Sequence, residues 1–334
     1  MAADWSVLSR QEESRQPSIL SEQNQTPNNT CPEPVEGNNE QRTTLALSLS
    51  KGTTTNEQNP IWMNNLQEHL QLAIRAALLA GDEIMKIYET DFSVDFKADH
   101  SPLTEADRQA HKVINRQLTA TGSPVLSEEG KHLPYEQRRH WKTLWIVDPV
   151  DGTKEFVKRN GEFTVNIALV KGQSPVLGVI WCPVARQLYF GNSQTSEAYR
   201  CQLDSHLSAD YTNELLQARA ERLPMPQKRS SVVVAVSRSH LTQDTHLFIN
   251  KIKQTKEVVL LSRGSSLKMC MIAEGSADVY PRMAPTSEWD TAAGQAIIEA
   301  AGGRVLDYAT KTPLVYNKPD LLNPWFVAFA KDKM

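Results

Sequence analysis

Residues 145–156 read Trp-Ile-Val-Asp-Pro-Val-Asp-Gly-Thr-Lys-Glu-Phe, a short apolar run that passes directly into two aspartates around a proline. The apolar residues predict a buried strand. Pro149 has no N–H for a sheet and fixes its own φ, so we expect the chain to turn immediately after Asp148. Gly152 permits a close approach of the backbone to a ligand. The turn is expected to aim the carboxylates of Asp148 and Asp151 at one point.

Two carboxylates at one point repel each other, and each raises the pKa of the other unless a cation or a proton lies between them. Oxygen ligands suit Mg²⁺ or Mn²⁺ and disfavour zinc. An Asp-Pro turn with a solvated second aspartate is the alternative for Asp-Pro-Val-Asp alone. Gly152 and Thr153 favour the metal site, because an exposed N–H and a hydroxyl serve a phosphate or an attacking water.

The composition limits the class of protein. The chain has 334 residues, is 40% hydrophobic and carries a formal net charge of -3, which suffices for one large or two modest domains. The near-neutral charge gives no electrostatic reason to expect a nucleic-acid polymer or an anionic membrane as the main partner. No apolar run approaches the roughly 18 residues of a membrane helix, and no signal-peptide pattern is present. Four cysteines without C-x-x-C spacing predict free thiols in a reducing cytoplasm: Cys31, Cys182, Cys201 and Cys270.

Residues 1–62 differ in composition from the rest, being rich in Gln, Asn, Ser, Thr, Glu and Pro. Such a segment cannot bury enough apolar surface to order itself, so we predict a disordered N-terminal extension. A regulatory tether is one alternative. An upstream over-read of the start codon is another, with Met63 as the initiator.

Residues 63–334 carry the periodic patterns of a folded protein. Apolar residues at helical spacing over 66–85 predict a long first helix, and Thr104 is the expected N-cap of a second. Alternation over 163–190 predicts an antiparallel meander. We expect an α+β or layered α/β fold with an N-terminal half over 63–205, carrying the metal site, and a C-terminal half over 206–334. The later elements are predicted as strands at 232–236, 257–261, 277–280, 304–306 and 325–330, and helices at 265–274 and 290–301.

Three further carboxylates are candidates for the same site. Glu128 follows the apolar pair Val125-Leu126 at a predicted strand end, although an isolated pair of glutamates is more often a solvated turn. Asp290 opens a predicted helix, where an ordinary Asp N-cap is the alternative. Asp107 lies three positions after Thr104 and could simply favour the helix dipole.

Together the motifs resemble the lithium-sensitive, magnesium-dependent phosphomonoesterases that include inositol monophosphatase. The motifs are Thr-Glu-Ala-Asp at 104–107, Ser-Glu-Glu at 127–129, Asp-Pro-Val-Asp-Gly-Thr at 148–153 and Trp-Asp-Thr-Ala-Ala-Gly at 289–294. The resemblance covers residues 64–334 and implies an αβαβα sandwich. Within this superfamily the chain is most similar to bacterial 3'(2'),5'-bisphosphate nucleotidases, through 151–169 and Gly-Ser-Ser-Leu-Lys at 264–268. Lys154-Glu155 is the discriminating detail, since inositol monophosphatases usually have Asn before the Phe.

The resemblance implies roles for these residues. Two or three Mg²⁺ ions, with Mn²⁺ as a substitute, are expected to bind the metal ligands, which also contact the substrate through its bridging phosphate. Asp107 and Thr153 are expected to orient and deprotonate the nucleophilic water, and with Glu128 they form the implied catalytic set. Gly152 and Thr153 are expected to donate backbone N–H groups to the phosphate. The implied metal ligands are Glu128, Asp148, the carbonyl of Val150, Asp151 and Asp290.

The nucleotidase branch also implies contacts to the second phosphate and the base, from His240, Ser265, Lys268 and Arg282. Ser265 is expected to begin a helix, whose N-terminal N–H groups favour an anion. The alternative for Lys268 and Arg282 is a solvated surface charge, which is the usual state of such residues. For His240 it is an ordinary loop histidine.

The function implied is magnesium-dependent hydrolysis of adenosine 3',5'-bisphosphate to AMP and phosphate, and of 3'-phosphoadenylyl sulfate, in support of sulfate assimilation. The partner is then a small nucleotide, and the protein is a cytoplasmic monomer or homodimer. The bacterial branch adds a peripheral attachment to the inner membrane. The nearest alternative is inositol monophosphatase or fructose-1,6-bisphosphatase activity. An alternative of another class is a non-catalytic nucleotide or metal sensor.

Overall fold

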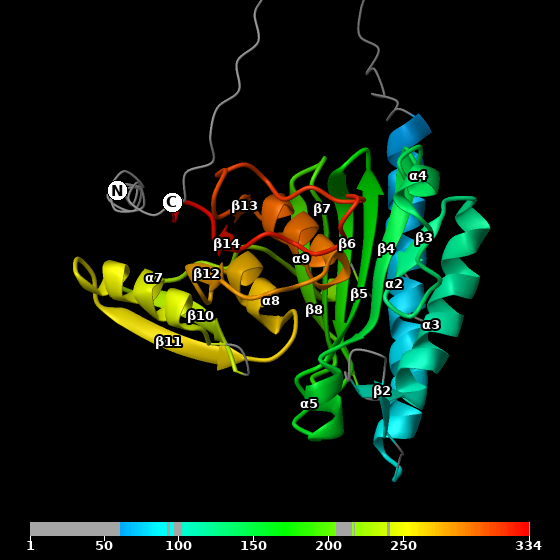
Figure 1. Ribbon diagram of the computed structural model, residues 1–334, viewed down its shortest axis with the longest axis horizontal. Coiled ribbons are helices and arrows are strands. Elements are labelled where there is room, and N and C mark those ends of the chain that lie inside the picture. The colour runs from blue at the N-terminus through cyan, green and yellow to red at the C-terminus, as the bar shows by residue number, and fades with distance from the viewer. Residues whose placement is uncertain are drawn as a thin grey trace, which may run out of the picture. The chain divides into compact units, whose positions relative to one another are not determined.

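The computed structural model describes residues 61–91, 94–96, 102–204, 216, 218–238 and 241–333 (Figure 1). Residues 61–334 fall in one compact unit. The predicted disordered extension lies outside the described residues apart from its last two positions. Cys31, which belongs to that extension, and His240 therefore lie outside the described residues.

A seven-stranded sheet is the larger of the two main sheets, in the order β3-β4-β5-β6-β7-β8-β9. β3 pairs parallel to β4, and all later neighbours pair antiparallel. This pattern confirms the predicted meander and extends it by two strands. The strands are β3 (Val125–Ser127), β4 (Thr143–Asp151), β5 (Thr164–Lys171), β6 (Ser174–Cys182), β7 (Gln187–Asn192), β8 (Glu197–Gln202) and β9 (Ala220–Arg222).

Two long helices, α2 (Ile61–Tyr88) and α3 (Glu105–Leu118), cover one face of this sheet (Figure 1). Side chains alternate across the strands, so Trp145 and Val147 pack with these helices while Leu144 and Ile146 face the other way. Thr104 caps α3 as predicted, in a capping box with Asp107. Short elements complete this part: β1 (Val94–Phe96), β2 (Pro102–Thr104), the 3₁₀ helix η1 (Thr119–Thr121), α4 (Tyr135–Arg138) and α5 (Thr153–Val157).

A five-stranded sheet in the order β11-β10-β12-β14-β13 is the second main sheet. Helices α8 and α9 pack between the two sheets, and α7 lies on the far face of the smaller one (Figure 1). The result is the layered αβαβα sandwich that was expected; α7 is an element that the sequence patterns missed. The bounds are β10 (Val232–Ser237), α7 (Gln243–Lys253), β11 (Val258–Arg263), α8 (Leu267–Glu274), β12 (Val279–Arg282), α9 (Glu288–Ala300), β13 (Arg304–Asp307) and β14 (Phe326–Phe329).

Helix α9 joins the two halves, because it packs closely on the seven-stranded sheet. A Cβ at Gly178 on β6 would lie 2.2 Å from the carbonyl oxygen of Ala293 on α9, so only glycine allows this approach. One hydrophobic core contains residues from both sides of position 205, and β9 of the first sheet follows that position. The division into halves at 205 stays a prediction. Among the described helices, none is long and apolar enough to cross a membrane.

Candidate metal and phosphate site

A β-bulge in β4 creates the site. The strand continues through Pro149 to Asp151, so the predicted turn after Asp148 is wrong. Asp148 pairs with Asn166 and Asp151 with Thr164, so three steps along β4 oppose two steps along β5. In a regular strand residues three apart point to opposite faces, and the extra residue of the bulge brings them to the same side. The missing N–H of proline is tolerated at such a place.

Asp148, Asp151 and Asp290 converge. Each offers one carboxylate oxygen, and these oxygens all lie within 4.8 Å of one another. Asp290 comes from the first turn of α9, which begins at Glu288 rather than at Asp290 as predicted. Ser287 is the N-cap and Asp290 the third helical residue of a capping box, with Asp290 Oδ2 accepting the Ser287 N–H at 2.8 Å. The cap therefore uses one carboxylate oxygen of Asp290, so capping does not exclude a second role.

Burial and mutual repulsion perturb these carboxyls strongly. Burial raises the pKa of Asp148 well above its usual value, and the charges of Glu128 and Asp151 raise it further. Burial and the charge of Asp151 raise the pKa of Asp290 to about 8. Glu128 acts on both groups although it stands outside the converging set of three. A divalent cation would favour the ionised forms, so the all-oxygen donor set fits Mg²⁺.

Hydrogen bonds position several of the predicted metal ligands. Glu128 follows β3, and its N–H donates to the carbonyl of Val147 on the adjacent β4 at 3.1 Å. The N–H of Val150 donates to Asp148 Oδ1 at 3.1 Å. Asp151 Oδ2 accepts the hydroxyl of Ser266 at 2.6 Å and the amide of Asn166 at 3.2 Å, two contacts that sequence reasoning missed.

Asp107 and Thr153, far apart in the sequence, meet at the edge of the acidic cluster. The Thr153 hydroxyl lies 3.4 Å from Asp107 Oδ1 and 3.3 Å from the carbonyl oxygen of Val150. Asp107 Oδ2 accepts both the N–H and the hydroxyl of Thr104, at 2.8 and 2.6 Å. With Asp107 only 2% exposed, its carboxylate is held in one orientation. A Thr153 hydroxyl that donates to either of these acceptors keeps a lone pair for a water molecule.

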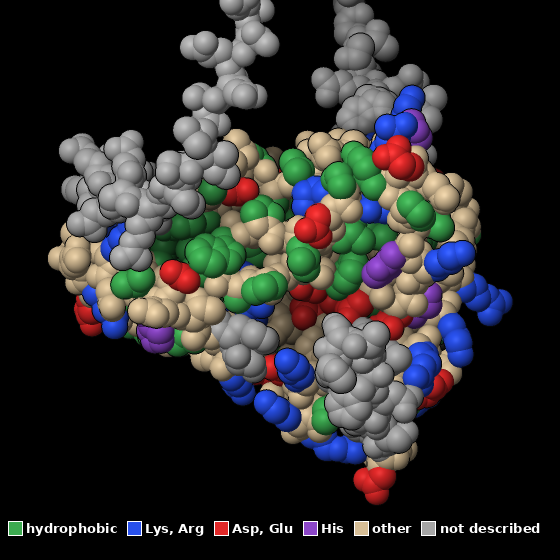
Figure 2. Space-filling model, in the orientation of Figure 1, with side chains coloured by type: hydrophobic (Ala, Val, Ile, Leu, Met, Phe, Trp, Pro, Cys, Tyr) green, Lys and Arg blue, Asp and Glu red, His purple; other side chains and the backbone are tan. Residues whose placement is uncertain are grey.

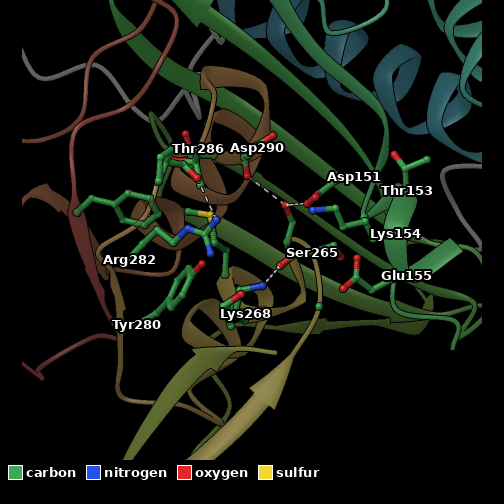
Figure 3. A pocket seen from close by; sticks show the side chains of 18 residues that line it. Asp151, Thr153, Lys154, Glu155, Ser265, Lys268, Tyr280, Arg282, Thr286 and Asp290 are labelled. Carbon is green, nitrogen blue, oxygen red and sulfur yellow. Dashed lines mark hydrogen bonds between the residues drawn. The ribbon is translucent and has the colours of Figure 1, made fainter. Parts of the chain in front are cut away.

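A cavity of about 280 Å³ lies beside the cluster, and its wall includes Asp151, Thr153 and Asp290. Figure 2 shows acidic side chains gathered in a hollow on this face, with Lys and Arg side chains along its lower rim. In Figure 3, Thr153 and Asp151 lie on one side of the cavity and Tyr280 and Arg282 on the other. An anionic wall therefore faces a wall that contains a cation.

Lys268 and Arg282 line this cavity and are only 4% and 9% exposed, so the surface-charge alternative is wrong. Lys268 Nζ donates to the carbonyl oxygens of Arg263, at 3.3 Å, and of Ser265. Burial lowers the pKa of Lys268 to about 8. Arg282 Nη2 donates to the carbonyl of Pro285 at 3.0 Å, while its buried Nε has no hydrogen-bond partner among the described residues.

Ser265 also lines the cavity, but it does not begin a helix as predicted. Helix α8 starts at Leu267 with Ser266 as its N-cap, and Ser265 has a left-handed backbone with φ of 40°. Gly152 has a φ of 93° and a Cβ there would lie 3.1 Å from Ser265 Cβ, so the two loops touch. His240 lies outside the described residues, so its predicted nucleotide contact stays a prediction.

Comparison with known proteins gives one consistent result. The model of the inositol monophosphatase family matches residues 65–328. The 3'(2'),5'-bisphosphate nucleotidase CysQ of Salmonella typhimurium is 42% identical over 261 residues, covering 77% of this chain and 98% of that protein. CysQ of Escherichia coli K12 is 43% identical over 252 residues, covering 74% and 94%. The crystal structure of CysQ from Bacteroides thetaiotaomicron superposes with a TM-score of 0.71 at 52% identity, covering 80% and 98%.

The raised pKa values predict opposite effects of pH and magnesium on stability. An aspartate has a pKa of about 4 in the unfolded chain, whereas the pKa of Asp290 in the folded protein is about 8. Between these two pH values the folded state binds more protons than the unfolded state, so the free energy of unfolding falls as the pH rises. Mg²⁺ favours the ionised carboxylates and stabilises the folded state by mass action. Calorimetry should show a larger magnesium-induced rise in Tm near pH 8 than near pH 6.

The Asp148→Asn, Asp290→Asn double variant is the control for this experiment. It should lose both the magnesium-induced shift and most of the pH dependence. An equal shift at both pH values in the wild-type protein would contradict a metal site built on these carboxyls.

Proposed function

The chain belongs to the inositol monophosphatase family, and we propose that it is a 3'(2'),5'-bisphosphate nucleotidase that hydrolyses adenosine 3',5'-bisphosphate to AMP and phosphate. The observation that carries the proposal is the cavity that joins a carboxylate cluster to the buried cations Lys268 and Arg282. A substrate with two phosphates needs both walls: one phosphate for hydrolysis at the cluster and a second to pair with cations. The identity to CysQ proteins over most of their length supports the same substrate. In this role the enzyme, acting also on 3'-phosphoadenylyl sulfate, supports sulfate assimilation.

We propose that the oxygens of Glu128, Asp148, Val150, Asp151 and Asp290 hold the ions, two or three Mg²⁺ in number. Bound magnesium neutralises charge on the phosphate and lowers the pKa of a bound water. Asp151 is oriented by Ser266 and Asn166, and Asp290 by its capping box, so the carboxylates are positioned before substrate arrives.

Thr153 and Asp107 are proposed to activate the water. The water donates a hydrogen bond to the Thr153 hydroxyl oxygen, and the Thr153 hydroxyl in turn donates its proton to Asp107 Oδ1. The water's proton is relayed to Asp107 through Thr153, while the backbone N–H groups of Gly152 and Thr153 bind the phosphate oxygens. We propose direct attack by water with inversion at phosphorus and without a phosphoenzyme.

The opposite wall is proposed to bind the rest of the nucleotide. Arg282 is the strongest anion ligand there because its buried Nε has no hydrogen-bond partner within the described part of the chain. Lys268 already donates to two carbonyl oxygens, so it contributes mainly its charge. Ser265 and His240 are proposed as further contacts.

The location of the protein is the next proposal. The described cysteines, Cys182, Cys201 and Cys270, are free and buried, which agrees with the expected cytoplasmic location. The peripheral contact with the inner membrane and the choice between monomer and homodimer stay predictions.

Comparison of substrates tests the proposal. With Mg²⁺ present, kcat/KM should be about 10–100-fold higher for adenosine 3',5'-bisphosphate than for inositol monophosphate or fructose 1,6-bisphosphate, because charge-assisted hydrogen bonds to the second phosphate are lost or misplaced. Phosphate release, measured with and without lithium, gives the comparison; lithium should inhibit. Equal turnover of inositol monophosphate would instead favour an inositol monophosphatase.

Asp107→Asn separates an enzyme from a non-catalytic sensor. The asparagine cannot accept the relayed proton, so kcat should fall by about 10²–10⁴-fold while the magnesium-induced rise in Tm persists. Glu105→Gln, on the same helical turn with a side chain 48% exposed, should leave kcat unchanged. Full activity of Asp107→Asn would refute the proposed water activation.

A further inference from the structure

Glu162 lies just before β5, against two neighbouring loops that both line the cavity. We define the phosphate loop as residues 151–153 and the serine loop as residues 264–266. We propose that Glu162 is a positioning residue that fixes the spacing between these loops and thereby the fit of a substrate with two phosphates. This inference rests on the proposed function and adds a specificity determinant to it.

The backbone of Glu162 is a shared packing surface for both loops. A Cβ at Gly152 in the phosphate loop would lie 3.1 Å from the Glu162 carbonyl oxygen. A Cβ at Gly264 in the serine loop would lie 3.0 Å from the same oxygen and 3.1 Å from Glu162 Cβ. Both loops therefore approach Glu162 so closely that a Cβ at either glycine would be crowded.

The carboxylate of Glu162 adds direct bonds. Its Oε2 accepts the backbone N–H of Gly264 at 2.7 Å. Its Oε1 accepts Arg238 Nη2 at 2.9 Å and lies 3.9 Å from Arg263 Nε. These two arginines follow or end β10 and β11, so one carboxylate ties the start of β5 to the ends of two strands of the other sheet.

The ion pairs of Glu162 with the arginines and its hydrogen bond from Gly264 differ in how much they stabilise the loop. The arginine side chains are 44% and 49% exposed, so solvent screens their attraction to the carboxylate. Glu162 itself is only 16% exposed and bonds a backbone N–H beside the cavity. An N–H left without an acceptor there is costly, so the bond to Gly264 is the one that should govern the loop.

Glu162 is itself held in place. Its N–H donates to Asn160 Oδ1 at 3.0 Å, and the preceding Gly161 has a φ of 75°. Arg159 Nη1 donates to the carbonyl of Tyr88 at the end of α2, at 2.7 Å. Residues 159–162 are thus anchored to the first helical layer. A Glu162 fixed in this way can hold the serine loop in one position.

The serine loop contacts both proposed walls of the cavity. The Ser266 hydroxyl binds Asp151 at 2.6 Å, and the Ser265 carbonyl accepts from the Lys268 ammonium. Loss of the Glu162 bond would release Gly264 and Ser265 next to the second-phosphate wall, whereas Ser266 would keep its own bonds to Asp151 and to the carbonyl of Asp290. Binding should therefore suffer more than the chemical step.

Steady-state kinetics on the intact protein with magnesium test this. Glu162→Ala should raise KM for adenosine 3',5'-bisphosphate about tenfold or more, with kcat changed less than about twofold. KM for adenosine 3'-monophosphate, which lacks the second phosphate, should change much less. Glu162→Gln should restore most of the affinity because its amide oxygen still accepts the Gly264 N–H.

Two further variants keep the test decisive. Glu162→Asp keeps the charge but falls short of Gly264, so it should also raise KM, even if the alanine variant does not fold. Glu221→Ala, which removes an exposed partner of Arg200 at the far end of the seven-stranded sheet, should match wild type. The proposal is overturned if KM is unchanged in the alanine and aspartate variants, or if kcat falls as much as KM rises. Absence of wild-type turnover would instead refute the proposed function.

Discussion

Repulsion among the carboxylates of Asp148, Asp151 and Asp290 is the constraint on which the rest of the structure depends. Three such groups with oxygens within 4.8 Å are unfavourable in a protein interior unless protons or cations neutralise them. The fold supplies this arrangement through one bulge in β4 and one helix start in α9. A cation bound there would stabilise the folded state, which is the coupling expected of the proposed magnesium-dependent hydrolase.

Rigid helix starts hold two of the acidic residues. Asp107 and Asp290 each stand at the third helical position of a capping box, so one oxygen of each carboxylate accepts a backbone N–H and the other is left for the proposed site. The first turn of α9 has a further anchor in Glu288, which is fully buried and accepts from Lys318 Nζ at 2.6 Å. Sites built on such elements are held more firmly than sites on loops. The serine loop ends in Ser266, the N-cap of α8, and the bond that Gly264 donates to Glu162 holds its other end.

The sequence was informative where periodicity or motif spacing carried the signal. Alternation and helical spacing gave most strands and the long helices, and the resemblance gave the αβαβα layers. It was misleading at Asp148, because a proline after a strand predicts a turn. A β-bulge can be told from a turn only when the pairing with the neighbouring strand is known. Helix α7 was missed because its pattern of apolar residues is weak. Contacts such as Asn166 or Ser266 to Asp151 join residues 15 and 115 positions apart, which no local pattern encodes. A polar Asn166 within an apolar strand was the one available hint.

The location of bound metal tests the account most directly. Crystals grown with Mn²⁺ and measured at its absorption edge should show anomalous density within about 2.0–2.6 Å of carboxylate oxygens of Asp148, Asp151 and Asp290. Anomalous density confined to other carboxylates, with these three left without an ion at saturating Mn²⁺, would contradict it.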